Sequence, residues 1–453
     1  MATAVSAPGK VLLAGGYLVL DRTYTALVFG LGARIHVLVN DIDTSTGVEL
    51  SEIVVESPQF REASWIYGYH LTSEQGGVNV TQLNGQNTHS INSHPTSVST
   101  TPLSRNPFVE TALLYGLTYI STILPTGTTI KPAKLTILAD DSYYSNPATN
   151  TITPTSRFSD FNVTLKAAHK TGLGSSAALV TSFTGALLTH YLPTSKFNLA
   201  TPAGQSILHN LSQAAHCAAQ GKVGSGFDVA AAVYGTCIYR RFSPSILSSL
   251  GSPNTPGFAT RVKEIVENTP SKEGLKWDTE ISPNSVTIPK GFALIMCDVD
   301  CGSETVGMVK KVLAWRTANP DLSKSLWDDL QVRNEKLGTC LSTAADLEET
   351  TKAFSAIREK IREMSGLCGV PIEPVEQTQL LDALTGVEGV VGGVVPGAGG
   401  YDAVVLLVRD DVETKGRIDG FLEQWRGDGK GNVKVLGAQG ELEGARLEKV
   451  EGY

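Results

Sequence analysis

The sequence predicts an α+β protein of two lobes. Strand-like and helix-like segments are mixed in both halves of the chain, and a stretch over 243–289 that is rich in Pro, Ser and Lys separates the halves. With 453 residues, 41% of them hydrophobic, the chain can build more than one core. We therefore expect an N-terminal lobe over 1–245, a linker or insertion over 246–289 and a C-terminal lobe over 290–453.

Apolar segments separated by glycines predict consecutive strands near the start of the chain, over 14–20, 26–29 and 35–39. Residues 71–105 are rich in Ser, Thr, Asn and Gly, so we expect a polar surface insertion without chemistry. Asn106 and Pro107 are residue types preferred at an N-cap and at the first helical position, which predicts a helix over 107–124.

The remaining elements follow from composition and periodicity. Helices are expected over 177–191, 203–220, 305–317, 320–337 and 342–366, and strands over 236–239, 292–297 and 403–408.

The net charge of −8 and the pI near 5.6 bear on the class of partner. Nucleic-acid binding relies on clustered Lys and Arg, so this balance argues against a general nucleic-acid binder. Residues 1–10 lack the features of a signal peptide, and no run approaches the ~18 apolar residues of a membrane helix, so we expect a soluble, cytoplasmic protein with no membrane span. The six cysteines form no CxxC pair, which argues against a disulfide framework or a structural zinc site.

The most informative segment lies in a span without acidic residues. No Asp or Glu occurs between Asp160 and Asp228, and this span contains KTGLGSSAA at 170–178. Its two glycines let the backbone approach a ligand, its serines supply hydroxyls, and the residues that follow can begin a helix whose N-terminus attracts anions. Asp228, flanked by glycines, is then placed to hold a metal or take a proton. The pattern predicts phosphate binding and phosphoryl transfer.

Other nucleotide-binding motifs match less well. Gly172, Gly174 and Ala177 fit a dinucleotide-binding G-x-G-x-x-A, but the ribose-binding acid expected about 20 residues later is missing. Gly221-Lys222 is not followed by Ser or Thr, so it is not a Walker A loop. The protein-kinase His-Arg-Asp and Asp-Phe-Gly signatures are absent as well.

Three blocks occur in the order of the GHMP kinase superfamily, which the chain therefore resembles. They are SAPGK at 6–10, the segment 170–178 and PGAGGYD at 396–402. Within the superfamily, longer segments resemble the fungal-type phosphomevalonate kinases, namely 6–20, 170–179, 216–229 and 240–242.

The resemblance implies the two-lobed GHMP kinase fold, with an N-terminal lobe like ribosomal protein S5 domain 2 and a ferredoxin-like C-terminal lobe. It implies transfer of the γ-phosphoryl group of ATP to the 5-phosphate of (R)-5-phosphomevalonate, giving 5-diphosphomevalonate for isoprenoid and sterol synthesis. ATP and Mg2+ are the expected cofactors, and a monomer or homodimer is the expected assembly.

The resemblance also assigns Lys10 to the active site, and Lys10 and Asp228 are the expected catalytic residues. A cation beside Asp228 would keep the carboxylate ionised and neutralise charge on the transferring group. The acceptor phosphate is already anionic, so Asp228 is needed less as a base than for positioning groups or Mg2+. The superfamily's usual metal-binding Glu is missing from the acid-free span, and His216 lies near its place. We expect Ser176 and Asp228 to hold Mg2+ together with the phosphates.

The remaining site residues are expected from the loop and from the chemistry of the acceptor. The nucleotide-binding set is Lys170, Gly172, Leu173, Gly174, Ser175, Ser176 and Ala177. The acceptor brings a carboxylate and a phosphate, which basic and hydroxyl groups recognise. The substrate-binding set is Lys222, Ser225, Arg240, Arg241, Ser303, Thr305, Lys310, Gly397 and Gly399.

Two alternatives stay open. One is another GHMP enzyme, a mevalonate kinase or a diphosphomevalonate decarboxylase, although Gly15-Gly16-Tyr17 replaces the Gly-Glu-His of mevalonate kinases. The other is a non-catalytic relative that binds ATP and a metabolite, against which the retention of Lys10, Ser176 and Asp228 argues.

Overall fold

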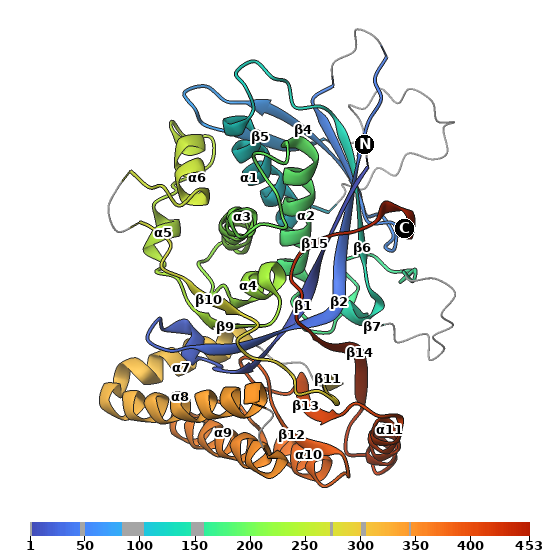
Figure 1. Cartoon of the computed structure of the whole chain (residues 1–453), viewed down its shortest axis with the longest axis vertical. Helices are drawn as coiled ribbons and strands as arrows, with labels where there is room; N and C mark the ends of the chain where they lie inside the picture. The colour runs from blue at the N-terminus through green and yellow to red at the C-terminus, as the bar shows by residue number, and fades with distance from the viewer. Residues whose placement is uncertain are drawn as a thin grey trace.

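The computed structural model describes residues 2–45, 50–83, 104–145, 158–271, 275–299, 305–343 and 346–453. These residues form two lobes, drawn one above the other in Figure 1, and strands and helices are mixed in both. The α+β class and the two-lobed architecture are therefore confirmed. Ser303 and residues 84–103 of the expected polar insertion lie outside the described residues.

The N-terminal lobe is built on a long central strand. β2 (Ala26–Asp41) pairs antiparallel with β1 (Thr3–Ala14), and nearly every residue of both is buried, because both faces of this part of the sheet are covered. β2 unites the two strands expected over 26–29 and 35–39. The sheet continues through β6 (Ala133–Ala139), β3 (Glu52–Glu56), β4 (Ser64–Leu71) and β5 (Val78–Leu83), and β9 (Cys237–Arg240) pairs with the start of β2.

The expected strand over 14–20 is wrong. β1 ends at Ala14, the chain turns at Gly15-Gly16, and Leu18–Leu20 forms a short 3-10 helix, η1. Tyr17 has a φ of 63°, a left-handed conformation that a strand does not contain. The apolar residues of this segment are buried although they lie in a turn and a short 3-10 helix. Their hydrophobicity was therefore no evidence for a strand. The expectation of an irregular insertion over 71–105 is also wrong in part, since β5 extends the sheet edge there.

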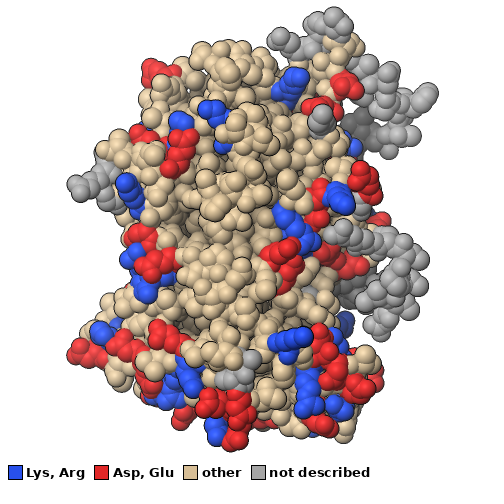
Figure 2. Space-filling view, viewed as in Figure 1, with Lys and Arg blue, Asp and Glu red and all other residues tan. Residues whose placement is uncertain are grey.

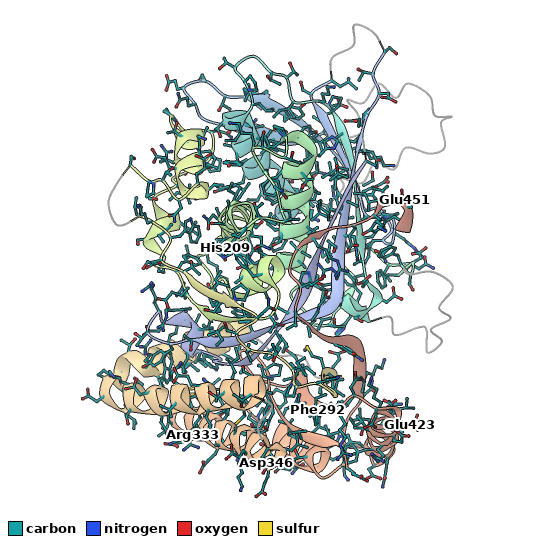
Figure 3. The ribbon with its side chains drawn as sticks, viewed as in Figure 1. His209, Phe292, Arg333, Asp346, Glu423 and Glu451 are labelled. Carbon is teal, nitrogen blue, oxygen red and sulfur yellow. The ribbon has the colours of Figure 1, made fainter. Side chains whose placement is uncertain are left out.

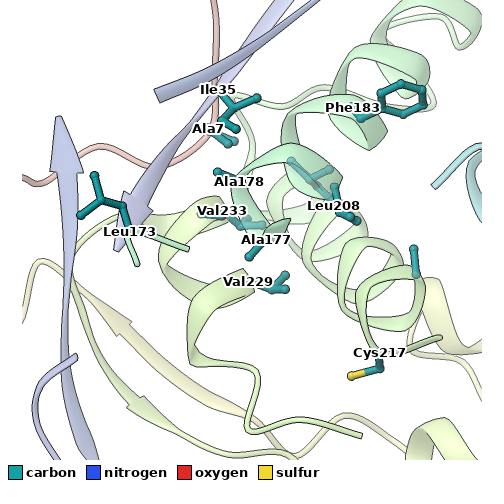
Figure 4. Close-up of a cluster of buried hydrophobic side chains, with 14 of the residues drawn as sticks. Ala7, Ile35, Leu173, Ala177, Ala178, Phe183, Leu208, Cys217, Val229 and Val233 are labelled. Carbon is teal, nitrogen blue, oxygen red and sulfur yellow. The ribbon is translucent and has the colours of Figure 1, made fainter. Parts of the chain in front are cut away.

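Helices α1 (Pro107–Ile123), α2 (Ser175–Tyr191) and α4 (Phe227–Tyr234) pack against this sheet, and α3 (Pro202–Gln220) packs on these three helices. α1 begins where predicted, with Asn106 accepting a hydrogen bond from the Val109 N–H at 3.3 Å. Figure 4 shows the apolar side chains that α2, α3 and α4 bury together with the strands, among them Ala7, Ala177, Phe183, Leu208 and Val229. A further pair of short strands, β7 (Tyr144–Ser145) and β8 (His169–Lys170), leads into α2.

The C-terminal lobe is an antiparallel sheet with helices on both faces. Its strands lie in the order β12 (Val390–Val394), β13 (Ala403–Arg409), β11 (Phe292–Val299) and β14 (Val433–Glu441). Alternate residues of β11 and β13 pack under α10 (Val375–Thr385) and α11 (Val412–Gly427), and the others join the main core with α7 (Thr305–Ala318), α8 (Pro320–Thr343) and α9 (Leu347–Cys368). The helices expected between 305 and 366 are present, with boundaries moved by a few residues.

The end of the chain returns to the N-terminal lobe. β14 pairs with β11 and also with β2, where Gly440 lies opposite Leu31. β15 (Arg446–Leu447) then pairs with β1, and η3 (Val450–Gly452) follows, so that both chain ends lie on the upper lobe in Figure 1. Arg34 of β2, only 2% exposed, forms an ion pair with Glu441 at 3.1 Å. One sheet thus runs through both lobes.

The expected linker over 246–289 contains regular structure. It holds α5 (Ser245–Ser248), α6 (Phe258–Val266) and β10 (Glu280–Pro283), and β10 pairs with β9. The ring of Phe258 lies 5.5 Å from that of Tyr115, and Asn210 donates a hydrogen bond to the Val266 carbonyl at 3.1 Å. We propose that 246–289 and the residues after β14 fold as parts of the N-terminal lobe.

Charged side chains are unevenly spread over the surface. On the face drawn in Figure 2, acidic and basic side chains are intermixed over the C-terminal lobe and sparse over the centre of the N-terminal lobe. Among the described residues, no helix has both the length and the apolar character that crossing a membrane requires.

One histidine of α3 is buried among aromatic side chains of the N-terminal lobe. His209 lies inside this lobe (Figure 3), is 3% exposed and packs against Tyr234 and Trp277. Its Nδ1 lies 3.1 Å from the Asn210 side-chain oxygen. Burial lowers the pKa of His209 from its ordinary 6.5 to about 4, because the charged imidazole would lose its hydration.

We therefore expect acid to destabilise the fold through His209. As the pH falls from 6.5 towards 4, the unfolded chain binds a proton that the folded chain does not, so stability that is complete above pH 6.5 is lost. Between pH 7 and pH 5 this loss amounts to about 2 kcal/mol. Urea unfolding of the wild type and of His209→Leu at both pH values measures it, and the variant should lose about 2 kcal/mol less than the wild type. Equal losses in the two proteins would contradict the assignment.

Candidate active site

A cavity of about 790 Å³ lies between the lobes. The N-terminal lobe lines it with the end of β1, the segment 169–172, the end of α3 and the turn before α4. The C-terminal lobe contributes residues of β11, α7 and the glycine-rich turn before β13. The cavity therefore brings together the three sequence blocks that are far apart in the chain.

The predicted phosphate loop is followed directly by α2. Gly172 and Gly174 have φ values of 75° and 81°, and Gly174 caps the helix without a side chain. The first N–H groups of α2 therefore face no capping side chain, which suits an anionic ligand. Ser175 and Ser176 occupy the first turn, where their hydroxyls are half-buried.

Lys10 is fixed against this loop. Its backbone N–H donates to the Leu173 carbonyl at 2.9 Å, and its Nζ donates to the Gly172 carbonyl at 3.1 Å. The side-chain stem lies over Gly174, since a Cβ built on that glycine would be 2.9 Å from Lys10 Cε. Burial lowers the pKa of the Lys10 ammonium from its ordinary value, and the attraction of Asp228 opposes this shift.

Asp228 lies in the first turn of α4. Its Oδ1 accepts a hydrogen bond from the Val229 N–H at 3.0 Å, and its side chain is 22% exposed. Its Oδ2 lies 3.8 Å from Nδ1 of His216, which is too long for a hydrogen bond but close enough for electrostatic attraction. The carboxylate therefore lies between Lys10, which attracts it, and His216.

His216 connects Asp228 with the phosphate loop. The imidazole is 2% exposed and stacks on Phe108 with ring centroids 5.7 Å apart. Its Nε2 lies 3.1 Å from Ser176 Oγ and 3.2 Å from Gln220 Nε2. The line from Ser176 through His216 to Asp228 was not predicted. The sequence had placed His216 only near the position of a missing acid.

Five of the nine expected substrate-binding residues line the cavity, namely Lys222, Ser225, Arg241, Gly397 and Gly399. Arg240 does not line it; its guanidinium donates to the Arg22 and Thr23 carbonyls and pairs with Glu280. Lys310 is an exposed residue of α7 outside the cavity lining, Thr305 begins α7, and Ser303 lies outside the described residues. The geometry therefore gives Arg240 a structural role and gives Lys310 no contact with the cavity.

Arg241 brings a positive charge to the cavity wall. Its guanidinium donates to three carbonyls, those of Leu20 at 2.7 Å, Val223 at 3.2 Å and Gly224 at 2.9 Å. Within the described residues no carboxylate lies within ion-pair distance of it. Its charge is therefore available to an anionic ligand, together with those of Lys10 and Lys222.

A second, apolar hollow lies on the other side of the phosphate loop. Its lining includes Lys170, Ser175 and Ser176 of the loop together with the aromatic side chains of Phe60, Trp65, Phe108 and Tyr144. Lys170 lines both hollows. Sequence reasoning missed the aromatic residues, because they come from three separate segments and carry no motif.

The segment that follows the first sequence block meets the third block across the lobes. The Gly397 N–H donates to the Leu12 carbonyl at 3.0 Å, and the Tyr17 hydroxyl donates to the Ala398 carbonyl at 2.6 Å. A Cβ on Gly16 would lie 2.1 Å from the Gly397 carbonyl oxygen, so a larger residue does not fit there. The absence of a side chain at Gly16 therefore lets the two lobes touch beside the cavity.

The two loop glycines allow a matched test of how Lys10 is held. Both have positive φ, so alanine at either position costs about 1 kcal/mol in backbone strain. Gly172 has nothing within 4 Å of an added Cβ, whereas at Gly174 the Cβ would displace Lys10. We expect Gly174→Ala to lower kcat by about tenfold or more and Gly172→Ala to lower it by less than about threefold. Steady-state kinetics and thermal melting separate the two effects, and equal kcat values would contradict the role of this contact.

Comparison with known proteins agrees with this geometry. The GHMP kinases N terminal domain matches residues 150–236. The chain is similar to phosphomevalonate kinase ERG8 of Gibberella zeae, with 56% identity over 99% of this chain and 97% of that protein. It is also similar to phosphomevalonate kinase erg8 of Aspergillus fumigatus, with 44% identity over 100% of this chain and 98% of that protein.

A solved structure matches the fold as a whole. It is Streptococcus pneumoniae phosphomevalonate kinase in complex with phosphomevalonate and AMPPNP, with a TM-score of 0.60 and 16% identity, covering 97% of this chain and 99% of that one. With identity this low, the match supports the GHMP kinase fold alone. The full-length similarity to the fungal enzymes is far higher, and on that ground the chain belongs to the phosphomevalonate kinases of the GHMP kinase superfamily.

Proposed function

We infer that the cavity between the lobes is where this chain transfers the γ-phosphoryl group of ATP to the 5-phosphate of (R)-5-phosphomevalonate. The reaction is that of the family to which the chain belongs, and it yields 5-diphosphomevalonate in the mevalonate pathway of isoprenoid synthesis. The observation that carries the placement is the meeting of Lys10, Gly172 of the loop that leads into α2, and Asp228 in the lining of one cavity. An aligned anion site, a cation and a carboxylate are the parts that phosphoryl transfer needs.

Each of the two hollows suits one of the two substrates, ATP or phosphomevalonate. We propose that the phosphates of ATP lie on the N-terminus of α2 and that the adenine base lies against Phe60, Trp65 and Phe108. This hollow measures about 60 Å³, less than a purine occupies, so the aromatic walls must part to admit the base. The γ-phosphate then points past the loop into the larger cavity, which accepts phosphomevalonate.

Lys10 and Asp228 act on the transferred group in different ways. The acceptor phosphate already carries negative oxygens, so its attack needs alignment and charge neutralisation more than a base. Lys10 supplies a fixed cation beside the loop, and its contacts with Gly172 and Leu173 hold it in place before substrate arrives. Asp228 attracts the Lys10 ammonium electrostatically and would supply a carboxylate to a cation bound with the nucleotide.

The donor groups of the site fit Mg2+. This ion is usually held by one or two carboxylates together with substrate phosphates, and the site offers the Asp228 carboxylate and the Ser176 hydroxyl. We propose that these two residues hold Mg2+ with the nucleotide phosphates; since His216 lies between them in this structure, the Ser176 hydroxyl must leave His216 for one ion to contact both. When bound, Mg2+ neutralises charge on the β- and γ-phosphates. The described residues contain no group of three or more acidic, His or Cys side chains arranged for a metal, which favours entry of the ion together with ATP.

An assay with related acceptors tests the assignment. Release of ADP from Mg2+-ATP is followed with 5-phosphomevalonate, mevalonate or 5-diphosphomevalonate in separate reactions, and the products are identified by mass. We expect turnover only with 5-phosphomevalonate, giving a second phosphate on C5. Release of CO2, or phosphorylation of mevalonate, would assign the chain to another GHMP reaction. Tight ATP binding without any turnover would favour a non-catalytic relative.

Substitutions test the two central residues. We expect Lys10→Met and Asp228→Asn each to lower kcat by about 10²-fold or more, because charge neutralisation at the transferred group is lost. Lys310→Met is a matched control, since Lys310 is an exposed lysine outside the cavity, and its kcat and KM should stay within about twofold of wild type. Circular dichroism checks that each variant folds. Near-normal turnover of either central variant would remove that residue from the mechanism.

We propose the cytoplasm as the compartment and a monomer or homodimer as the assembly. The five described cysteines are all free thiols and four of them are buried, which suits a reducing compartment. Cell fractionation and light scattering check the two proposals.

A further inference from the structure

The segment that follows β1 contains a strained turn with a tyrosine at its centre. The Leu18 N–H donates to the Gly16 carbonyl at 2.8 Å, and Tyr17 between them has a φ of 63° and a ψ of −44°. This hydrogen bond and these dihedral angles belong to the rare form of γ-turn that strains an L-residue. Glycine tolerates a positive φ far better, so a tyrosine persists here only if its side chain makes contacts that offset the strain.

The Tyr17 side chain makes such a contact with the other lobe. It is 3% exposed and lines the cavity, and its hydroxyl donates to the Ala398 carbonyl at 2.6 Å. Burial raises the pKa of Tyr17 above its ordinary value, so the hydroxyl keeps its proton and stays a donor. The strained residue of one lobe therefore holds the backbone of the other lobe at the cavity.

The backbone that Tyr17 holds is a glycine-rich turn over 396–400, here named the third-block turn. Most of this turn lines the cavity. Its start is tied to β1, because the Gly397 N–H donates to the Leu12 carbonyl at 3.0 Å, and its middle is tied to Tyr17 through Ala398. A shift of Ala398 would therefore change the shape of the cavity wall.

We propose that Tyr17 is a positioning residue that fixes the third-block turn against the acceptor in the larger cavity. The proposal rests on the proposed function, because it takes this cavity as the place where phosphomevalonate binds. The phosphate loop is held separately, by the hydrogen bond of the Lys10 N–H to the Leu173 carbonyl. Loss of the Tyr17 hydroxyl should therefore weaken the use of the acceptor and leave the use of ATP unchanged.

Two tyrosines of the loop after β1 allow a matched test. Tyr17→Phe keeps the ring and removes the hydroxyl that reaches the third-block turn. Tyr24→Phe is the control, since Tyr24 is 4% exposed and its hydroxyl donates to Asp328 of the C-terminal lobe at 2.9 Å, but it does not line the cavity. The ion pair of Asp21 with Arg316 keeps the Tyr24 attachment in place when that hydroxyl is lost. Each variant thus loses one hydrogen bond between the lobes.

Steady-state kinetics with phosphomevalonate and ATP varied in turn give the result. We expect Tyr17→Phe to raise the KM for phosphomevalonate about fivefold and to leave the KM for ATP within about twofold of wild type, because a single hydrogen bond contributes at most about a tenfold factor. Tyr24→Phe should keep both KM values within about twofold of wild type. Calorimetry should show the same affinity for AMPPNP in all three proteins, and circular dichroism checks that they fold.

A second variant reaches the same turn from another residue. A Cβ on Gly16 would lie 2.1 Å from the Gly397 carbonyl oxygen, and Gly16 is not among the residues with a positive φ, so alanine there displaces the turn without backbone strain. We expect Gly16→Ala to raise the KM for phosphomevalonate more than the KM for ATP. Adding Tyr17→Phe to it should raise that KM by less than Tyr17→Phe does alone, because both act on one turn.

Several outcomes would overturn the role of Tyr17. They are equal KM values in Tyr17→Phe and Tyr24→Phe, a rise in the KM for ATP as large as that for phosphomevalonate, and independent effects in the double variant. If Tyr17→Phe does not fold, Gly16→Ala must show the selective rise by itself. A wild-type protein without turnover of phosphomevalonate would count against the proposed function and against this role with it. Normal wild-type turnover with an unaffected Tyr17→Phe removes only the role of Tyr17.

Discussion

The hydrogen bond from the Lys10 backbone N–H to the Leu173 carbonyl is the contact on which the active site depends. It joins the first strand of the protein to the phosphate loop, and it forms where a bulge after Pro8 breaks the regular register between β1 and β2. Once β1 is held there, the Lys10 stem lies on Gly174 and its ammonium reaches Gly172. A cation and an anion-binding helix N-terminus are thereby placed together before any ligand is present, which is the preorganisation that electrostatic catalysis needs.

The second constraint is the attachment of the two lobes. The loop after β1 contacts the C-terminal lobe through the ion pair of Asp21 with Arg316 and the hydrogen bond of Tyr24 to Asp328 at 2.9 Å. Arg241 donates to the Leu20 carbonyl of the same loop at 2.7 Å while lining the cavity. A single short segment thus carries contacts to both lobes and to the substrate cavity. Because this segment contacts both lobes, a change in the distance between the lobes would also move this wall of the cavity.

Local chemistry was predictable from the sequence, and long-range partnerships were not. The acid-free span, the loop glycines and the isolated Asp228 led to the proposed phosphate loop, because each has a composition that few other roles require. In the structure Gly172 and Asp228 line the same cavity. Arg240 and Arg241 are neighbours in sequence, yet the Arg240 guanidinium donates to the Arg22 and Thr23 carbonyls whereas Arg241 lines the cavity. Successive side chains of an extended chain point to opposite sides, and β9 ends at Arg240. The contact of His216 with Ser176 depends on how α3 packs beside α2, which no local pattern encodes. The strand wrongly expected over 14–20 failed because buried apolar residues also occur in turns.

The return of the chain through β14 and β15 has a consequence for how the protein is made. β15 pairs with β1, and the Glu448 N–H donates to the Ala4 carbonyl at 2.9 Å, so β1 is synthesised more than 400 residues before the segment that pairs with its edge. Until then the edge of β1 and the buried guanidinium of Arg34 lack their final partners. Contacts of such sequence separation close slowly, and an unpaired edge during synthesis is a point where chaperones or neighbouring chains can bind.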